Sequence, residues 1–253
     1  MTNTLKAKLE NGQACLNGWS LLPSHFAIEL YAQGGWDCVT IDIQHGLHDY
    51  ASALLCIQAL QPRGVTPLVR VPWNEPGILG KVLDAGAQGI ICPMVNNAFD
   101  AVALTRACFY PPLGQRSYGT VRGAAYGGST PYSVRANQDV LILPQIETAE
   151  AVANVDEILD TPGIGGIFVG PSDLGLSLGL PAMMDREEPV ILEVYEKLLK
   201  ATLSRGLTPA IYCTAPAYAA RMIEMGFRLV TAGADSSMLI NGAREAVSAA
   251  RSS

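Results

Sequence analysis

Two carboxylates, Glu147 and Asp173, stand shortly after separate apolar runs of the chain. If those runs are neighbouring strands, ~4.8 Å apart, carboxylates just past their ends reach one cation. Two carboxylates with no nearby His or Cys suit a hard ion such as Mg²⁺ or Mn²⁺, and they leave coordination positions for water and a chelating substrate. Helix capping by Glu147 before Thr148, and by Asp173 in the turn after it, explains the same residues, so spacing alone leaves both interpretations open.

A guanidinium and an imidazole accompany this pair. Arg70 ends an apolar run and needs an anionic partner, because a buried unpaired charge is costly. A substrate carboxylate or enolate oxygen fits the planar guanidinium, and so does Asp42 or Asp84 in a structural role. The spacing Asp42-x-x-His45 allows the carboxylate to orient and charge the imidazole, which makes His45 a candidate acid, base or water activator. A lone histidine is also commonly structural.

The elements that must position these groups are short, nearly continuous apolar runs followed by stretches with helical spacing. Such runs are typical of strands buried on both faces. We predict strands over 15–22, 37–44, 66–71, 89–94, 140–147, 166–169, 208–213 and 228–232. We predict helices over 49–61, 75–85, 98–108, 148–159, 189–205, 215–225 and 236–250. Eight alternating strands and helices without a linker favour one α/β domain over 1–253, a (β/α)₈ TIM barrel, over a doubly wound open sheet.

In such a barrel the working groups stand at the C-terminal ends of the strands. Those positions hold Trp19, Asp42, His45, Arg70, Gln145, Glu147, Pro171, Ser172 and Asp173. The long polar segment 110–138 follows the fourth strand, and we expect it to overhang the barrel mouth as a functional loop. Gly233 after the last strand indicates either a phosphate site or a tight turn capped by Asp235 or Ser236; without a second glycine-rich loop we favour the cap.

Composition narrows the class of protein. The chain has 253 residues, 49% of them hydrophobic, and a formal net charge of -6 without a basic cluster, so a nucleic-acid partner is not expected. No apolar run reaches membrane-spanning length, and the polar N-terminus lacks a signal core. Six scattered cysteines without a C-x-x-C pair indicate buried thiols in a reducing cytosol, so we expect a cytoplasmic protein.

Taken together, the motifs resemble the HpcH/HpaI aldolase family, class II pyruvate aldolases, and within it the 4-hydroxy-2-oxoheptanedioate and hydroxy-ketoacid aldolase branch. The resemblance runs from about Leu16 to the C-terminal helix. The motifs that carry it are Asp42-x-x-His45, Val69-Arg70-Val71-Pro72, Leu83-Asp84-Ala85-Gly86-Ala87-Gln88-Gly89, Pro112-x-Gly114-x-Arg116-Ser117, Gln145-Ile146-Glu147-Thr148 and Gly170-Pro171-Ser172-Asp173-Leu174.

The resemblance implies a role for each matching residue. Glu147 and Asp173 would hold a divalent cation (Mg²⁺, Mn²⁺ or Co²⁺), and Gln145 and Trp19 would lie close by. The backbone around Pro171, Ser172 and Asp173 would hold the carboxylate of pyruvate. Arg70 would bind the keto oxygen, and His45, oriented by Asp42, would move protons. It also implies a homo-oligomer, a hexamer built as a dimer of trimers, in which the helix at about 236–250 packs on a neighbouring subunit. Asp84, Arg116 and Ser117 would lie near an interface or behind the site.

The implied reaction is cleavage or formation of 4-hydroxy-2-oxoacids from pyruvate and an aldehyde. Many family members carry Gly-Glu-His where this chain has Ile43-Gln44-His45. The hydroxy-ketoacid aldolase branch resembles this chain in having Gln-His-Gly there, so the resemblance implies that hydroxypyruvate also serves as a donor. No predicted strand carries a lysine, which argues against a Schiff-base aldolase. The alternatives are a 2-oxoacid decarboxylase or CoA-ester lyase on the same enolate site, and a metal-independent phosphate-binding barrel.

Overall fold

The strands of this chain close into one parallel barrel. The structure is a computed structural model that describes residues 3–125 and 131–251. Each strand pairs in parallel with the next one in sequence, and β8 closes on β1. The strands are β1 Cys15–Ser20, β2 Cys38–Asp42, β3 Thr66–Arg70, β4 Gly89–Cys92, β5 Leu141–Ile146, β6 Gly166–Val169, β7 Thr208–Ile211 and β8 Leu229–Ala234. The predicted α/β barrel is confirmed, and the open doubly wound sheet is excluded because the sheet has no edges.

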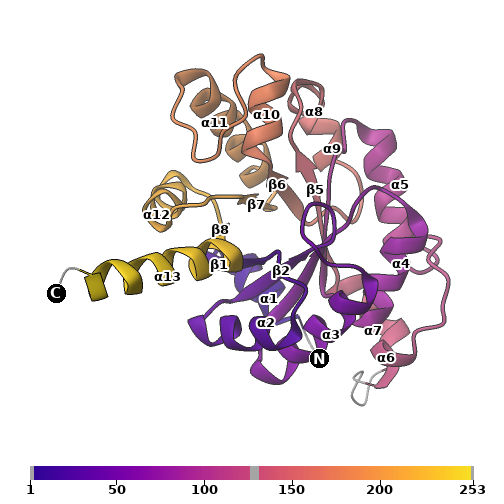
Figure 1. The fold of residues 1–253 in the computed structure, drawn as a ribbon. Helices are drawn as coiled ribbons and strands as arrows, with labels where there is room; N and C mark the ends of the chain where they lie inside the picture. Colours follow the sequence, from indigo (N-terminus) through magenta and orange to yellow (C-terminus); the bar gives the residue numbers. More distant parts are fainter. Residues whose placement is uncertain (1–2, 126–130, 252–253) are drawn as a thin grey trace.

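Helices surround the barrel (Figure 1). They are α1 Thr4–Glu10, α2 His25–Tyr31, α3 Tyr50–Leu60, α4 Pro76–Ala85, α5 Ala98–Cys108, α6 Val121–Ala125, α7 Tyr132–Asp139, α8 Ala149–Ala153, α9 Val155–Leu159, α10 Pro171–Ser177, α11 Pro189–Leu203, α12 Pro216–Met225 and α13 Asp235–Arg251. The helices predicted over 49–61, 75–85, 98–108, 189–205, 215–225 and 236–250 are present, whereas those over 4–10, 25–31, 121–125, 132–139 and 171–177 were not predicted. The single helix predicted over 148–159 is wrong. It is two short helices, α8 and α9, because the backbone leaves the helical region at Asn154, whose amide donates a hydrogen bond to the carbonyl of Asn96.

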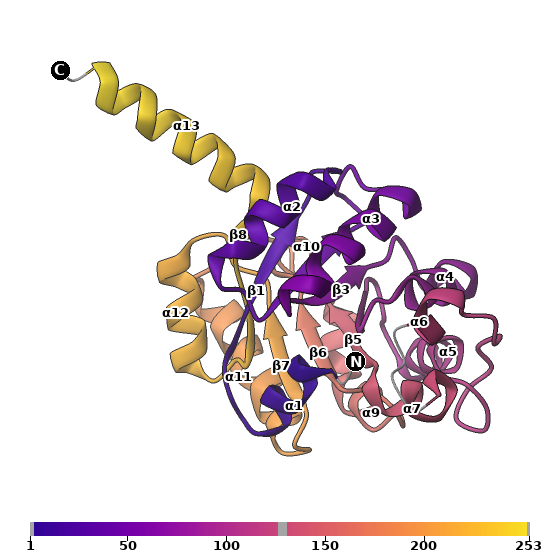
Figure 2. The ribbon, with the colours of Figure 1, turned by 90° about the horizontal axis from the view of Figure 1, so that it is seen from below.

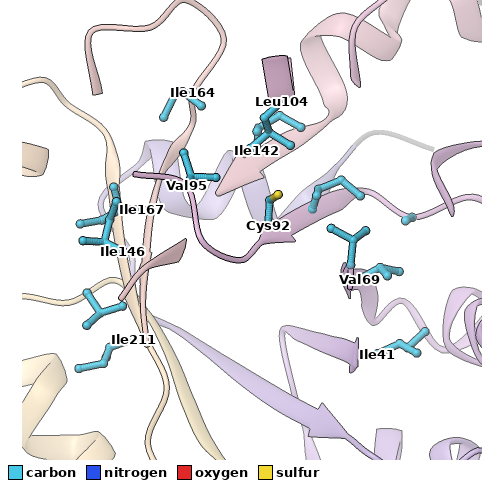
Figure 3. Packing of buried hydrophobic residues seen from close by; sticks show 14 of the residues in the cluster. Ile41, Val69, Cys92, Val95, Leu104, Ile142, Ile146, Ile164, Ile167 and Ile211 are labelled. Carbon is cyan, nitrogen blue, oxygen red and sulfur yellow. The ribbon is translucent and has the colours of Figure 1, made fainter. Parts of the chain in front are cut away.

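Two apolar layers position the strands. A smaller cluster fills the barrel interior and includes Trp19, Leu68 and Phe168. A larger cluster lies between the strands and the helices; Figure 3 shows Ile41, Val69 and Ile142 from three of those strands. Successive strand residues point to opposite faces, so Ile41 packs against helices while its neighbour Asp42 belongs to the other face of β2. This alternation brings polar side chains at the strand ends to the barrel mouth.

Segment 110–138 does not lie where we predict it. It begins after α5, which has already returned the chain to the N-terminal end of the barrel, and its described parts, 110–125 and 131–138, do not overhang the mouth. There Lys6 of α1 donates to the carbonyl of Gln138, and Arg122 donates to the carbonyl of Ala85 at the end of α4. The segment contains α6 and most of α7, and residues 126–130 lie outside the described part of the chain.

Helix α13 confirms the helix predicted over 236–250, but it packs on the barrel only at its start. In both ribbon views it projects away from the body (Figures 1 and 2), and Asp235 is its one buried residue among those described. Four large apolar side chains on it, Met238, Leu239, Ile240 and Val247, are exposed. Over 3–125 and 131–251, no helix has both the length and the apolar character that crossing a membrane requires.

Candidate active site

A cavity of about 350 Å³ opens at the C-terminal ends of the strands. It is lined by Trp19, Leu21, Asp42, His45, Arg70, Gln145, Phe168, Gly170, Pro171, Ser172, Asp173, Met184 and Tyr212. Eight of the nine side chains predicted to stand at the strand ends are in this set. The ninth, Glu147, is buried beside the cavity and contacts two of its residues, Gln145 and Gly170.

Asp42 and Arg70 form a two-pronged ion pair in the cavity wall. They end β2 and β3 at paired positions of the sheet. Arg70 Nε donates to Asp42 Oδ1 at 2.9 Å and Nη2 donates to Oδ2 at 2.5 Å, and the Asp42 side chain is 0% exposed. Burial alone would raise the pKa of the Asp42 carboxyl, but the hydrogen bonds and charge of Arg70, with two backbone amides, hold it below its usual value. The sequence left Asp42 and Asp84 as possible structural partners of Arg70, and the structure selects Asp42.

His45 stands on the turn that follows β2. Asp42 Oδ1 accepts hydrogen bonds from the backbone N–H groups of Gln44 and His45, at 3.0 and 3.2 Å. Gly46 closes the turn so tightly that a Cβ there would lie 2.2 Å from the carbonyl oxygen of Asp42. Asp42 thus positions the backbone of this turn and binds Arg70 at the same time. That its carboxylate also orients the imidazole of His45 stays a prediction. The exposed imidazole lines the cavity.

Trp19, at the end of β1, is the aromatic floor of the site. Its indole N–H points to Asp42 Oδ2 at 3.3 Å, and the Arg70 guanidinium carbon lies 4.9 Å from its ring centroid. Phe168 and Tyr212 pack against the same ring, with centroids 5.6 and 5.0 Å away. The ion pair is therefore stacked on an aromatic cluster, which limits its freedom to move.

Glu147, directly after β5, is 2% exposed. Its Oε1 accepts from the backbone N–H of Met94 at 2.8 Å, and its Oε2 accepts from the side-chain amide of Gln145. Met94 reaches it with φ 54, a left-handed conformation that costs a non-glycine residue on the order of 1 kcal/mol. Burial raises the pKa of Glu147, the two hydrogen bonds oppose this, and the charge of Asp173 adds to it. A nearby cation would stabilise the ionised form.

Asp173 lies in the first turn of α10, and Pro171 and Ser172 precede it. Pro171 takes the first helical position, where no N–H is needed, and the N–H groups after it lie at the positive end of the helix dipole. Gly170 permits the close approach of β5 and β6, because a Cβ there would lie 2.7 Å from Glu147 Oε2. The two carboxylates predicted from sequence are therefore brought to one corner of the cavity.

The donor set at this corner fits a divalent cation with an open coordination sphere. Gln145 Oε1 is buried and has no hydrogen-bond partner, so this amide oxygen beside Glu147 can act as a further ligand to a cation. Among the described residues no group of three or more His, Cys, Asp or Glu side chains has an arrangement that could hold a metal ion, so a closed structural zinc site is not offered there. Oxygen donors in small number suit Mg²⁺ or Mn²⁺, with water and substrate completing the shell.

Known proteins match this chain over nearly its whole length. The profile of the HpcH/HpaI aldolase/citrate lyase family matches residues 18–242. The chain belongs to that family. A hydroxypyruvate/pyruvate aldolase from Rhizorhabdus wittichii is 37% identical over 98% of this chain and 99% of its own length. A 4-hydroxy-2-oxo-heptane-1,7-dioate aldolase from Escherichia coli is 34% identical over 96% and 93%. The crystal structure of a family protein from Burkholderia cenocepacia superposes with a TM-score of 0.92 at 32% identity, covering 99% and 100% of the two chains.

Three residues of the HpcH/HpaI motifs lie outside the cavity of this member. Asp84, Arg116 and Ser117 line a separate groove of about 700 Å³ beside α4 and α5. Arg116, 1% exposed, donates to Asp84 Oδ1 at 2.5 Å and lies 4.6 Å from the ring centroid of Tyr110. Within this chain the three residues do not support the metal corner, and their place at a subunit interface stays a prediction.

At the end of β8 a carboxylate, that of Asp235, occupies the position where a phosphate site would need positive groups. The Asp235 carboxylate accepts hydrogen bonds from the Ser20 hydroxyl at 2.9 Å and from the backbone N–H groups of Leu21 and Leu22 at 3.0 and 3.2 Å. The carbonyl of Gly233 accepts from the Tyr31 hydroxyl. Asp235 therefore joins the start of α13 to the end of β1, and its negative charge disfavours a phosphate there.

Four side chains of the cavity were not predicted from sequence. Leu21, Phe168, Met184 and Tyr212 line it beside the predicted residues. Phe168 and Tyr212 lie on or after strands β6 and β7, so reading aromatic residues as well as polar ones at the strand ends would have found Tyr212. Met184 comes from the loop between α10 and α11, and nothing local in the sequence brings it to the mouth.

Proposed function

We propose that this chain is a divalent-metal-dependent aldolase, a carbon–carbon lyase that cleaves or forms 4-hydroxy-2-oxoacids with pyruvate as the enolate donor. The observation that carries the proposal is that the Arg70 guanidinium and the Asp173 carboxylate line one cavity and that the Glu147 carboxylate is buried beside it. Aldol chemistry needs stabilisation of an enolate's negative charge, and both features supply it. The names of the relatives at 34% and 37% identity support the same reaction.

The donor is held at two points. Arg70 uses Nε and Nη2 for Asp42, and no described residue accepts from its Nη1. That edge of the guanidinium binds the keto oxygen of the 2-oxoacid. The N–H groups of Ser172 and Asp173, at the start of α10, hold its carboxylate. Glu147, Asp173 and the Oε1 of Gln145 would hold the cation, which supplies Lewis-acid stabilisation of the enolate when bound.

His45 moves the proton. In cleavage it accepts, directly or through water, the hydroxyl proton at C4. The O–H electron pair becomes the aldehyde C=O bond, the C3–C4 bond breaks, and its pair remains on the donor as the enolate whose oxygen faces Arg70. Protonation at C3 then gives pyruvate. Formation runs the same steps in reverse, starting with removal of a proton from the methyl group of pyruvate.

We also propose that copies of the chain associate into the hexamer that the family resemblance implies, and that α13 of each copy packs on a neighbouring subunit. The exposed apolar side chains Met238, Leu239, Ile240 and Val247 of α13 support this, because a projecting helix with an uncovered apolar face gains stability by covering it.

The role of His45 is tested by exchange of the methyl protons of pyruvate for deuterium in D₂O, followed by NMR with Mg²⁺ present. Wild-type protein should catalyse the exchange, and His45→Ala should slow it about 10²- to 10⁴-fold. His25→Ala, an exposed histidine outside the cavity, is the matched control and should exchange at the wild-type rate. Exchange in His45→Ala at the wild-type rate would remove His45 from this role.

A further inference from the structure

Helix α10 carries the Asp173 carboxylate of the proposed metal corner, yet it has only seven residues, Pro171–Ser177. A helix of that length is not stable by itself in water, so its position depends on what it packs against. At its C-terminal end the Ser177 hydroxyl accepts a hydrogen bond from the N–H of Ala149 at 2.8 Å, which ties α10 to the start of α8. The middle of the helix rests on a different group.

That group is the guanidinium of Arg186. A Cβ built on Gly175 would lie 2.3 Å from Arg186 Nη1 and 2.5 Å from its Cζ, so the guanidinium lies directly against the backbone of α10. Any side chain at position 175 would overlap it. Gly175 and Asp173 are two residues apart in one helix, so a shift of the backbone at Gly175 moves the carboxylate of Asp173 with it.

The guanidinium is held in this place by partners of its own. Arg186 Nη1 donates to the carbonyls of Pro181 and Met183 at 2.7 and 3.4 Å, and Nη2 donates to Glu188 Oε1 at 2.7 Å. The backbone carbonyl of Arg186 accepts from the hydroxyl of Tyr218 on α12. The guanidinium therefore cannot retreat from α10 without breaking these hydrogen bonds.

The preceding residue, Asp185, fastens the same segment, 178–188 between α10 and α11, to the loop after β7. Asp185 Oδ1 accepts from the N–H of Thr214 at 2.8 Å, and Oδ2 accepts from the Thr214 hydroxyl and the N–H of Ala215 at 2.5 and 2.8 Å. Its φ of 48 lies in the left-handed region, which aspartate enters more readily than most residues. The segment is thus attached to the end of β7, and Arg186 connects it to α10.

Arg186 acts from inside the protein. It is 0% exposed within a single chain, so neighbouring subunits in an assembly do not change its contacts. Burying a guanidinium costs desolvation that an apolar side chain in the same place would avoid. What the planar group provides is a set of donors in fixed directions, which locks the distance between segment 178–188 and α10. Arg186 does not line the cavity, so it acts on a bound cation only through α10.

Resting on the proposed function, we propose that Arg186 is a positioning residue for the metal corner. Through its contact with Gly175 it sets the place of α10, so that the carboxylate of Asp173 binds the same cation as Glu147. Loss of the contact lets α10 move and separates the two carboxylates. The affinity for the cation then falls although neither carboxylate has been replaced.

The affinity of the full-length protein for Mn²⁺ alone, without substrate, tests this role. Free Mn²⁺ is measured by EPR at a temperature at which near-UV circular dichroism shows each variant to be folded. We expect Arg186→Leu and Gly175→Ala each to raise the Kd about 10- to 100-fold, as loss of a group that orients a metal ligand does. Arg186→Lys keeps the charge but lacks the planar group, and its Kd should lie between those of Arg186→Leu and wild type. A Kd within about 2-fold of wild type in both Arg186→Leu and Gly175→Ala would overturn the assignment.

The contact between the two residues predicts that their effects are coupled. The shorter side chain of Arg186→Leu leaves room for a Cβ at position 175. Gly175→Ala should therefore change the Kd less than about 2-fold in the Arg186→Leu background, against about 10-fold or more by itself. Effects that multiply fully in the double variant would show that Arg186 does not act through Gly175.

Two controls separate positioning from charge and from stability. Arg221→Met removes an exposed ion pair with Glu187 of the same segment and should keep the wild-type Kd. Ile57→Val shortens a fully buried side chain of α3, so it should lower Tm without changing the Kd. If Ile57→Val weakens Mn²⁺ binding as much as Arg186→Leu does, the effect is general destabilisation and the positioning role is wrong.

Glu147→Ala separates this proposal from the function on which it rests. If wild-type protein binds Mn²⁺, Glu147→Ala does not, and the Arg186 and Gly175 variants bind it as tightly as wild type, the positioning proposal is wrong and the aldolase proposal stands. If wild-type protein binds no Mn²⁺, or Glu147→Ala binds it equally well, the metal corner itself is wrong and the proposed function fails with it.

Discussion

Breaking the Asp42–Arg70 pair is the perturbation whose cost the structure defines best. Arg70→Met keeps much of the side-chain volume over Trp19 but removes the guanidinium. Asp42 then remains 0% exposed with three weaker donors, the indole of Trp19 at 3.3 Å and the N–H groups of Gln44 and His45 at 3.0 and 3.2 Å. Removing one partner of a buried ion pair typically costs about 3–5 kcal/mol. For a chain of this length, that corresponds to a fall in Tm of about 6–20 °C.

The loss should depend on pH in a defined direction. In wild-type protein the pKa of Asp42 is lowered by Arg70 against the opposing effect of burial. Its contribution to stability is therefore complete above the pKa of an unfolded aspartate, about 3.9, and is lost as the pH falls through the lower folded value. Without Arg70, burial raises the pKa of Asp42. The stability gap between wild type and variant should thus be largest near pH 7 and should narrow below about pH 4.

Urea and thermal unfolding of both proteins across this pH range measure the gap. Arg63→Met is the control, because Arg63 forms an exposed pair with Glu29 at 2.7 Å and its loss should cost no more than about 1 kcal/mol. If Arg70→Met costs as little as Arg63→Met, or if its cost is independent of pH, the buried pair does not hold the strand ends as we infer.

Three further outcomes follow from the same structure. In apo protein Glu147→Gln should keep or raise Tm near pH 7, because burial raises the pKa of Glu147 and its ionised form destabilises the fold above the pKa of an unfolded glutamate. Mg²⁺ or Mn²⁺ at 100 times Kd should raise the Tm of wild type by about 5–10 °C. Glu147→Gln should abolish that rise, whereas the control Glu157→Gln should retain it. Gly46→Ala should lower Tm or soluble yield, because its Cβ would lie 2.2 Å from the carbonyl oxygen of Asp42, and wild-type stability would contradict the tight turn. The pair Leu239→Lys and Ile240→Lys, on the exposed face of α13, should shift light-scattering mass toward smaller assemblies, and an unchanged mass would show that this helix does not join subunits.

The barrel could be predicted from the sequence because the patterns that indicate its strands and helices lie within short segments of the chain. Apolar β-branched runs such as the one at β2 alternate with amphipathic stretches, and each strand pairs with its sequence neighbour. The positions of Asp42, Arg70 and Glu147 followed from the rule that strand ends meet at one rim. The break at Asn154 was missed because it depends on a hydrogen bond to Asn96, a residue far away in sequence.

What could not be predicted depends on contacts across the barrel. Arg70 had several possible partners in the sequence, and only the register of β2 with β3 selects Asp42. The same pairing engages the Asp42 carboxylate with Arg70, and its role in orienting the imidazole of His45 stays a prediction. Segment 110–138 was assigned to the wrong end of the barrel, because the intervening helix α5 reverses the direction of the chain before the segment begins.

The most direct test of the account is pyruvate release from a 4-hydroxy-2-oxoacid, measured before and after EDTA and after re-addition of Mg²⁺, Mn²⁺ or Co²⁺. We predict that EDTA abolishes release, that a divalent cation restores it, and that Glu147→Ala shows none under any condition, because the buried carboxylate beside Gln145 is required to hold the cation. Release that is indifferent to EDTA, or that persists in Glu147→Ala, would contradict a metal-stabilised enolate at this corner of the cavity.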